Sequence, residues 1–385
     1  MNAMRSPKQS QRGRHISSAG LIGLLAISVS AVWAQPPARL VSPEVLPDNR
    51  VTFRFRDANA QSVTLTFGGG KPQAMVKDEQ GVWSLTTDPL EPDFYSYGFT
   101  ADGVILADPS NPLLKPNLLS NQSQVHVPGP AALAWEMNDV PHGIVHRHFY
   151  HSAVAGDQRD FYVYTPPGYD PRARQTYPVL YLLHGQSDDA SGWISIGRAE
   201  VILDNLIAQG KARPMLLVMP LGYGVPDFVP RISAAPGLND LRQRNFDKFR
   251  EALLGEVIPQ VEAGYRVRRK REARAIAGLS MGGAESLLTG LNHLNEFAWI
   301  GSFSAGGMNE DFATEFPALD AKANSQIRLL WVACGTDDGL IKINRTFRDW
   351  LKAQGVGHVD IETPGGHSWV VWRRNLVNFA PLLFR

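Results

Sequence analysis

Residues 274–288 read Arg-Ala-Ile-Ala-Gly-Leu-Ser-Met-Gly-Gly-Ala-Glu-Ser-Leu-Leu, which predicts a short apolar strand, a Gly-x-Ser-x-Gly turn and a helix. This turn is so tight that Gly278 and Gly282 must lack side chains, and it lifts the Ser280 hydroxyl above the edge of a sheet. Glycine and serine are common in this chain, so the pattern alone is a weak signal. It becomes specific when an acid and then a base follow it at the ends of later strands.

Two later segments supply an acid and a base in that order. Residues 327–335 form a nearly continuous apolar run, typical of a strand buried on both faces, and lead into Asp337 and Asp338. Residues 359–362 alternate like a short strand and are followed by two glycines and His367. Singly, such an aspartate is usually a turn or cap residue, and such a histidine a loop residue. Their joint order predicts a triad of the serine, the histidine and one of the two aspartates.

The triad predicts chemistry on an ester carbonyl. His367 would take the proton of Ser280 as the hydroxyl attacks, and would return it to the leaving alcohol. The developing oxyanion needs two backbone donors. One is expected to be the amide of Met281, at the start of the helix. The other is expected to be the amide of Gln186, after the apolar strand at 177–183, where a purely structural turn is the alternative.

The pattern along the chain predicts two kinds of domain. A small β-sandwich is expected over residues 37–128 and a linker over residues 129–141. Strands and helices alternate from residue 161 onward, which predicts a mostly parallel sheet covered on both faces within residues 142–385. In such a sheet the reactive groups belong at the carboxyl ends of the strands. The expected sandwich strands are 51–55, 62–67, 81–86 and 94–100.

Two residue clusters outside the triad have alternative interpretations. One set of aromatic residues in the first domain would form either a glycan-stacking platform or, more commonly for alternating aromatics, a core: Trp83, Phe94, Tyr95 and Tyr97. One set of histidines has spacing that zinc could use: His142, His146, His148 and His151. No cysteine or acidic ligand lies near these histidines, so we expect neither a metal nor a cofactor.

Charge and the amino terminus bear on the partners of the chain. Lys and Arg total 38 and Asp and Glu 37, a balance that predicts no nucleic-acid partner. Residues 1–34 have a basic start, a short apolar segment and the small-residue pattern ending at Ala34, which predicts a signal peptide. The mature protein is therefore expected to be secreted or periplasmic, with no membrane partner. Cys334 is the only cysteine, which excludes an intrachain disulfide.

Four motifs carry a resemblance to a known family. They are Tyr181-Leu182-Leu183-His184-Gly185, Gly278-Leu279-Ser280-Met281-Gly282-Gly283, Cys334-Gly335-Thr336-Asp337-Asp338 and Gly365-Gly366-His367. Together they resemble the secreted esterases of the α/β-hydrolase fold, which include feruloyl and acetylxylan esterases and, more distantly, mycolyltransferases and enterobactin esterases. The amino-terminal segment, with Ser42-Pro43, Trp83 and Asp108-Pro109-Ser110-Asn111-Pro112, resembles the early-set immunoglobulin-like module related to glycogen-binding modules.

The resemblance implies a serine carboxylic ester hydrolase acting through an acyl-enzyme on feruloyl or acetyl esters of plant cell-wall polysaccharide. The family's acid follows the Cys-Gly-Thr-x segment, which makes it Asp338 here. Ser368 follows the histidine where family members often have an aspartate, so the leaving-group side of the pocket differs. The alternatives are a siderophore or other small-molecule esterase, an acyltransferase, and an inert carbohydrate-binding protein. Four aromatic residues near the expected loops are candidates for an acyl pocket or for packing: Trp193, Tyr223, Phe228 and Trp369.

Overall fold

The computed structural model describes residues 39–234 and 239–385, and residues 40–385 form one compact unit. The predicted signal peptide, residues 1–34, lies outside the described residues. Within the described ranges, no helix combines the length and apolar character needed to cross a bilayer.

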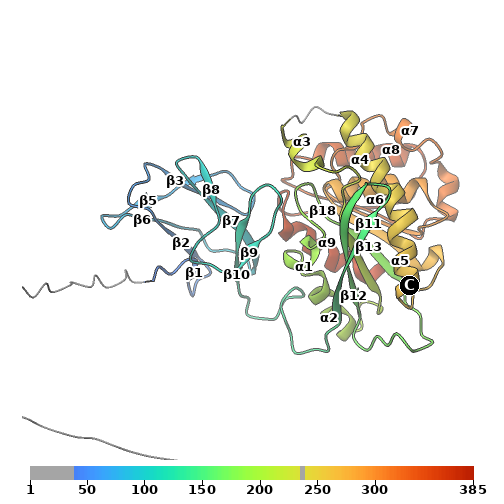
Figure 1. The fold of residues 1–385 in the computed structure, drawn as a ribbon, viewed down its shortest axis with the longest axis horizontal. Coiled ribbons are helices and arrows are strands. Elements are labelled where there is room, and N and C mark those ends of the chain that lie inside the picture. The colour runs from blue at the N-terminus through green and yellow to red at the C-terminus, as the bar shows by residue number, and fades with distance from the viewer. Residues whose placement is uncertain (1–38, 235–238) are drawn as a thin grey trace, which may run out of the picture. The chain divides into compact units, whose positions relative to one another are not determined.

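The first part of the chain is all-β. Its strands are β1 (Glu44–Val45), β2 (Val51–Arg56), β3 (Val63–Phe67), β4 (Gln73–Ala74), β5 (Val76–Lys77), β6 (Val82–Thr86), β7 (Asp93–Ala101), β8 (Val104–Leu106), β9 (Leu114–Lys115) and β10 (Gln122–Val127). They form two antiparallel sheets, β1-β2-β6-β5 and β4-β3-β7-β10-β9, with β8 paired to β7 (Figure 1). The four predicted strands match β2, β3, β6 and β7 to within one residue at each end.

A single apolar core joins the two antiparallel sheets. Alternate residues of the strands point into it, as half-buried strands require, and Phe53, Leu65 and Phe99 are fully buried there. Trp83 and Tyr97 belong to the same core, so they are packing residues and form no exposed stacking platform.

The second part of the chain is built on an eight-stranded sheet. Its strands are β11 (Ile144–Ser152), β12 (Asp157–Thr165), β13 (Val179–Leu183), β14 (Leu216–Pro220), β15 (Arg274–Leu279), β16 (Trp299–Phe303), β17 (Leu329–Gly335) and β18 (Val359–Thr363). The order is β11-β12-β14-β13-β15-β16-β17-β18. β12 pairs antiparallel with both β11 and β14, and the remaining pairs are parallel. The predicted mostly parallel sheet is confirmed.

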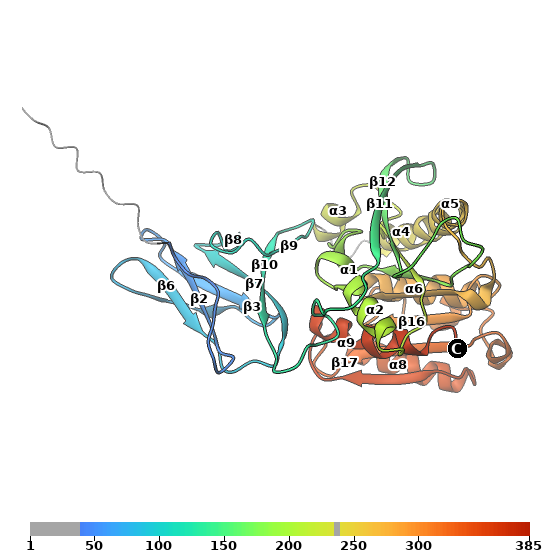
Figure 2. The same ribbon diagram turned by 90° about the horizontal axis from the view of Figure 1, so that it is seen from below.

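Helices cover both faces of this sheet. They are α1 (Gly192–Ser195), α2 (Ala199–Ala208), α3 (Phe228–Ala234), α4 (Asn239–Ala252), α5 (Ile258–Gly264), α6 (Met281–Asn292), α7 (Phe312–Glu315), α8 (Ile341–Ala353) and α9 (Trp369–Phe379). The apolar cluster on one face takes residues from α4, α6 and α8, and that on the other face from α2 and α9. Figure 2 shows α2 near α9. α4 and α5 are joined by a π-helical turn at Leu253–Val257.

The segment predicted as a linker, residues 129–141, is anchored to α2. Trp135 is buried, and its carbonyl accepts a hydrogen bond from Arg198. The amide of Asn205 donates to the carbonyls of Ala134 and Glu136 at 2.8 and 2.9 Å. This segment therefore packs as part of the second domain's surface.

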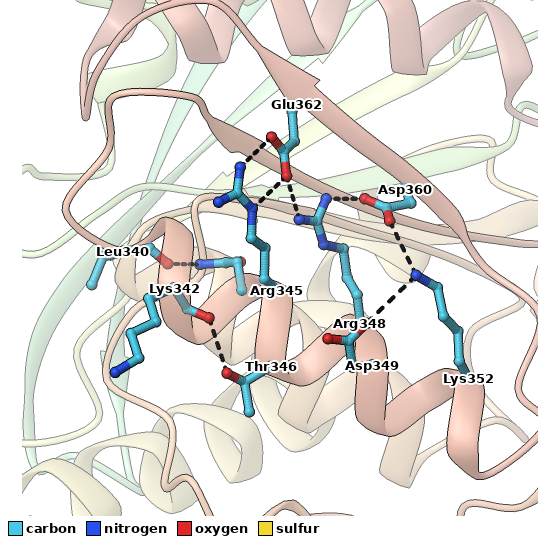
Figure 3. Close-up of polar contacts among 10 residues, drawn as sticks. Leu340, Lys342, Arg345, Thr346, Arg348, Asp349, Lys352, Asp360 and Glu362 are labelled. Carbon is cyan, nitrogen blue, oxygen red and sulfur yellow. Dashed lines mark hydrogen bonds and ion pairs between the residues drawn. The ribbon is translucent and has the colours of Figure 1, made fainter.

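Ion pairs fasten α8 to the edge strand β18 (Figure 3). Arg345 contacts both carboxylate oxygens of Glu362 at 2.8 and 2.6 Å, and Arg348 reaches Glu362 at 2.7 Å and also Asp360. The hydrogen bonds from the two arginines lower the pKa of Glu362 to about 2. α8 follows the loop that contains Asp338, and β18 precedes the loop that contains His367, so this network holds two site-bearing loops together.

Candidate active site

Ser280 lies in the turn between β15 and α6 with φ 52° and ψ −116°, a strained region for a residue with a side chain. A Cβ on Gly278 would lie 2.4 Å from the carbonyl oxygen of Gly282, and one on Gly282 would lie 2.4 Å from that of His184. Both glycines are thus required by close backbone approach, as predicted. The Ser280 amide donates to the Phe303 carbonyl at 2.9 Å, which holds the turn against β16.

The structure brings Ser280, His367 and Asp338 into one hydrogen-bonded chain. His367 Nε2 lies 3.0 Å from Ser280 Oγ, and His367 Nδ1 lies 2.8 Å from Asp338 Oδ2. The three residues follow β15, β18 and β17, so they meet at the carboxyl edge of the sheet. Asp337 is exposed and makes no contact with the imidazole among the described residues.

Asp338 is held as an ionised acceptor. It is 2% exposed, and its Oδ1 accepts the Leu340 amide at 2.8 Å. Burial raises the pKa of Asp338, but the hydrogen bond and charge of His367 outweigh burial and leave this pKa below its ordinary value. An ionised Asp338 can therefore fix the imidazole tautomer that leaves Nε2 free to accept the serine proton.

Trp372 packs against the imidazole of His367, a contact that was not predicted from the sequence. Its ring meets that of His367 edge-on with centroids 4.8 Å apart, and its indole N–H donates to Ser304 Oγ at 3.2 Å. The signal available in the sequence was an aromatic residue one helical turn into α9, on the face turned toward the loop.

The two predicted oxyanion donors flank Ser280. Met281 is the first residue of α6, so its amide is one of the four helix donors without an intrahelical partner. Gln186 follows β13 in a loop that passes close to the serine, since a Cβ on Gly185 would lie 3.2 Å from the Ser280 Cβ. Over residues 39–234 and 239–385, no hydrogen bond engages the Gln186 amide. Their role as oxyanion donors remains a prediction.

Buried polar groups support the Gln186 loop from behind. His184 Nε2 accepts the Gly222 amide at 2.8 Å, so the proton is on Nδ1, which donates to the Gly185 carbonyl at 2.8 Å. Burial lowers the pKa of His184 and favours this neutral form. Tyr223 donates its hydroxyl to the Asp188 carbonyl at 2.7 Å. The loop is therefore fixed at both ends before any ligand binds.

Three of the four predicted pocket aromatics lie behind the cleft wall. Trp193 is fully buried and donates its indole N–H to the Leu183 carbonyl at 2.9 Å. Phe228 is buried against Tyr223, which supports the loop. Only Trp369 lines the cleft. Trp193, Tyr223 and Phe228 were predicted as ligand contacts because they are aromatic and lie near the loops. In the structure they belong to the hydrophobic core.

The cleft above Ser280 has a volume of about 200 Å³ and is lined by both domains. The second domain contributes the Gln186 loop, Ser280, His367 and the start of α9. The all-β part contributes one wall, made of Gly68, Gly69, Phe94, Ser96, Lys115, Asn117 and Gln122.

Two of the four histidines with zinc-like spacing make other polar contacts. His142 Nδ1 lies 3.0 Å from Asp204 Oδ2, and His148 stacks on Phe161 while its Nε2 lies 2.6 Å from the Tyr265 hydroxyl. Among the residues with described positions, no group of three or more metal-ligating side chains converges.

Glu285 is a buried carboxyl one helical turn beyond the serine, and it predicts a pH-dependent stability. Its side chain is 1% exposed, and neither carboxyl oxygen has a hydrogen-bond partner among the described residues. Burial raises the pKa of Glu285 well above its ordinary value, so the folded protein holds a proton that the unfolded chain releases above about pH 4.5. Stability is therefore lost as pH rises past that value.

Replacing Glu285 with glutamine should remove this loss. The free energy of unfolding of Glu285→Gln is compared with that of the unmodified protein by urea denaturation at pH 4 and at pH 8. The difference between the two proteins should shift in favour of Glu285→Gln by at least about 1 kcal/mol from pH 4 to pH 8. Glu272→Gln is the control, because hydrogen bonding to its own backbone amide holds the pKa of exposed Glu272 below its ordinary value. A Glu285→Gln difference that does not change with pH would refute this assignment.

Comparison with known proteins agrees with the architecture. The family model Esterase, described as "Putative esterase", matches residues 152–383. An endo-1,4-beta-xylanase/feruloyl esterase from Xylanibacter ruminicola is 30% identical over 354 residues, covering 89% of this chain and 46% of that protein. This chain thus spans about half the length of that relative. An acetyl esterase from Caldicellulosiruptor saccharolyticus is 25% identical over 233 residues, covering 52% of this chain and 80% of that protein.

Solved structures show the same fold. A ferulic acid esterase from Anaeromyces mucronatus, in complex with ferulic acid, aligns with a TM-score of 0.56 and 25% identity over 65% of this chain and 93% of that one. The enterobactin esterase of Shigella flexneri aligns with a TM-score of 0.64 and 19% identity over 86% of this chain and 92% of that one. The predicted α/β-hydrolase fold behind an all-β region is confirmed, and the chain belongs to the Esterase family.

Proposed function

We propose that this protein is a serine carboxylic ester hydrolase that works through an acyl-enzyme, with Ser280, His367 and Asp338 as its catalytic triad. The observation that carries the proposal is the continuous hydrogen-bonded chain from the Ser280 hydroxyl through the His367 ring to the buried Asp338. Nucleophile, base and orienting acid lie within the distances that acyl transfer requires.

In this mechanism His367 Nε2 removes the Ser280 proton as Oγ attacks the ester carbonyl. The amides of Met281 and Gln186 stabilise the oxyanion that forms. His367 then gives the proton to the departing alcohol, and a water molecule activated by the same imidazole releases the acid from Ser280. Asp338 stabilises the charged imidazole in both halves of the reaction.

We further propose that the substrate is a feruloyl or acetyl ester carried by plant cell-wall polysaccharide, and that the protein works after export. Support for the substrate comes from the activities for which the relatives are named and from the aromatic rings of Phe94, Trp369 and Trp372 at the cleft, which suit an aromatic acid. A siderophore-type ester is the second candidate, since the likeness to the enterobactin esterase extends over both domains.

A panel of esters assayed on the purified protein tests this proposal. We expect kcat/KM to be highest on a feruloyl ester such as methyl ferulate or on acetylated xylan, and at least tenfold lower on a catecholate trilactone. The reverse order would replace the cell-wall assignment with the siderophore assignment. A protein without activity on any ester of the panel would refute the proposed hydrolase.

A further inference from the structure

The all-β part of the chain reaches the candidate active site, and resting on the proposed function we infer what it does there. We propose that Lys115 and, on the Gln186 loop, Asp188 form a subsite for the hydroxyl groups of a sugar in the alcohol half of the ester, with Asn117 holding the two loops beside each other. The all-β part would then select substrates at the catalytic cleft itself, with no separate glycan platform needed.

A buried ion pair fixes this wall in place. Arg373 of α9 and Asp93 at the start of β7 meet at 2.6 Å, and both side chains are 0% exposed. Arg373 also donates to the carbonyl of Ile196 at 2.9 Å and to that of Phe94. Arg373 thus bonds to both domains in a region closed to solvent. The all-β wall is therefore held in a fixed position at the cleft.

The loop that carries the subsite is bonded directly to the Gln186 loop. The Leu118 amide donates to the Ser187 carbonyl at 2.8 Å. The Asn117 side-chain amide donates to Ser187 Oγ at 2.9 Å and to Asp188 Oδ1 at 3.2 Å. Lys115 lies two residues before Asn117, at the end of β9, and its ammonium is 3.3 Å from Gln122 Oε1. Donors and acceptors of the two domains are thus interleaved beside Ser280.

The charges of the subsite favour a neutral polar ligand. Asp188 is 6% exposed, and burial raises its pKa to about 6 although Lys115 acts against this. Burial likewise lowers the pKa of Lys115, and Asp188 opposes that change. A cation and an anion of this kind nearly cancel, so an anionic ligand gains little here. Neutral hydroxyl groups can donate to one and accept from the other.

The first turn of α9 suits the other half of the ester. Trp369 and Trp372 of this turn line the cleft with aromatic rings, whereas Lys115, Gln122 and Asp188 line it with polar side chains. The all-β wall also reaches the backbone of His367, because a Cβ on Gly69 would lie 3.6 Å from the His367 carbonyl oxygen. His367 is the group that returns the proton to the leaving alcohol, so a polar wall beside it faces the alcohol.

The test compares two esters that share one acid. The ratio of kcat/KM for feruloyl arabinose to that for methyl ferulate is measured for the unmodified protein, Lys115→Met, Lys115→Arg and Lys71→Met. We expect Lys115→Met to lower this ratio about tenfold, mostly through KM, since a hydrogen bond to a charged group is lost. Lys115→Arg keeps the positive charge, so its ratio should stay close to that of the unmodified protein. Lys71, exposed on the same domain and outside the cleft, is the control and should leave the ratio as it is.

Three outcomes would overturn the subsite. One is a Lys115→Met ratio equal to that of the unmodified protein, and another is an equal loss on both esters. The third is a change in the preference for methyl ferulate over methyl cinnamate, which would place the phenol of the acid at Lys115. Thermal unfolding of each variant distinguishes these three outcomes from a folding defect. Lys115→Gln replaces any Lys115 variant whose thermal midpoint falls well below that of the unmodified protein. An unmodified protein that is inactive on both esters but active on p-nitrophenyl acetate would instead remove the feruloyl-ester assignment and the subsite with it, and leave the proposed hydrolase in place.

Discussion

Ser280→Ala should lower kcat on an activated aryl ester by about 10⁴-fold or more, because no covalent acyl-enzyme can form without the hydroxyl. The loss should appear in kcat rather than in KM, since the cleft that binds the ester is unaltered. Alanine keeps a Cβ at the strained φ of 52°, so the turn and the fold should persist with the same thermal midpoint to within a few degrees. Initial rates with p-nitrophenyl acetate, corrected for hydrolysis in buffer, provide the measurement.

A serine of α6, the helix that follows Ser280, gives a matched control. Ser286 Oγ donates to the Gly282 carbonyl at 2.6 Å, and Ser286 is fully buried. Ser286→Ala removes one hydroxyl from α6 without touching the imidazole, so its kcat should stay within a factor of a few. A Ser280→Ala protein that retained a tenth of the original kcat would show that another group attacks the ester.

Asp338→Asn should lower kcat/KM by about 10⁴-fold. An amide in place of the carboxylate can no longer stabilise the imidazolium, and by donating to Nδ1 it would place the imidazole proton on Nε2, where the serine proton must go. The change keeps the size of the side chain, and the 2.8 Å contact with the Leu340 amide can persist through the amide oxygen. The loss is therefore expected in catalysis, with a modest change in stability.

Asp337→Asn is the control for this substitution, because it makes the same chemical change one residue away on an exposed side chain. We expect its kcat/KM to lie within a factor of two or three of the unmodified value. Activity that survives Asp338→Asn and fails in Asp337→Asn would mean that the acid has been misassigned.

The site was predictable where local rules are strict. The turn at Ser280 demands glycine at two fixed positions, and the strands before Asp338 and His367 are apolar runs that end in polar loops. Parallel strands bring their carboxyl ends to one edge, so residues far apart in sequence meet without any further information. Sequence position alone left two aspartates open, and burial of one of them distinguishes the two in the structure.

What escaped the sequence depends on packing between distant segments. Trp193 and Phe228 are apolar residues near the predicted loops, and nothing in sequence separates a ring that lines a cleft from one that supports it from behind. The 129–141 segment has a linker's composition, yet it is held by Asn205 of α2 and by Arg198, the residue before α2. The contact between the Lys115 loop and the Gln186 loop spans 70 residues of sequence, and periodicity carries no signal for it.

The central claim is that Oγ of Ser280 is the atom that becomes acylated. Intact and peptide mass spectrometry after reaction with a fluorophosphonate, which modifies activated serines, tests it most directly. The account predicts one phosphonyl group per chain, located on Ser280, with esterase activity lost in proportion to labelling. Ser280→Ala and His367→Ala should not be labelled at the rate of the unmodified protein. Full labelling of a different residue, or full activity in a protein whose Ser280 is completely modified, would contradict it.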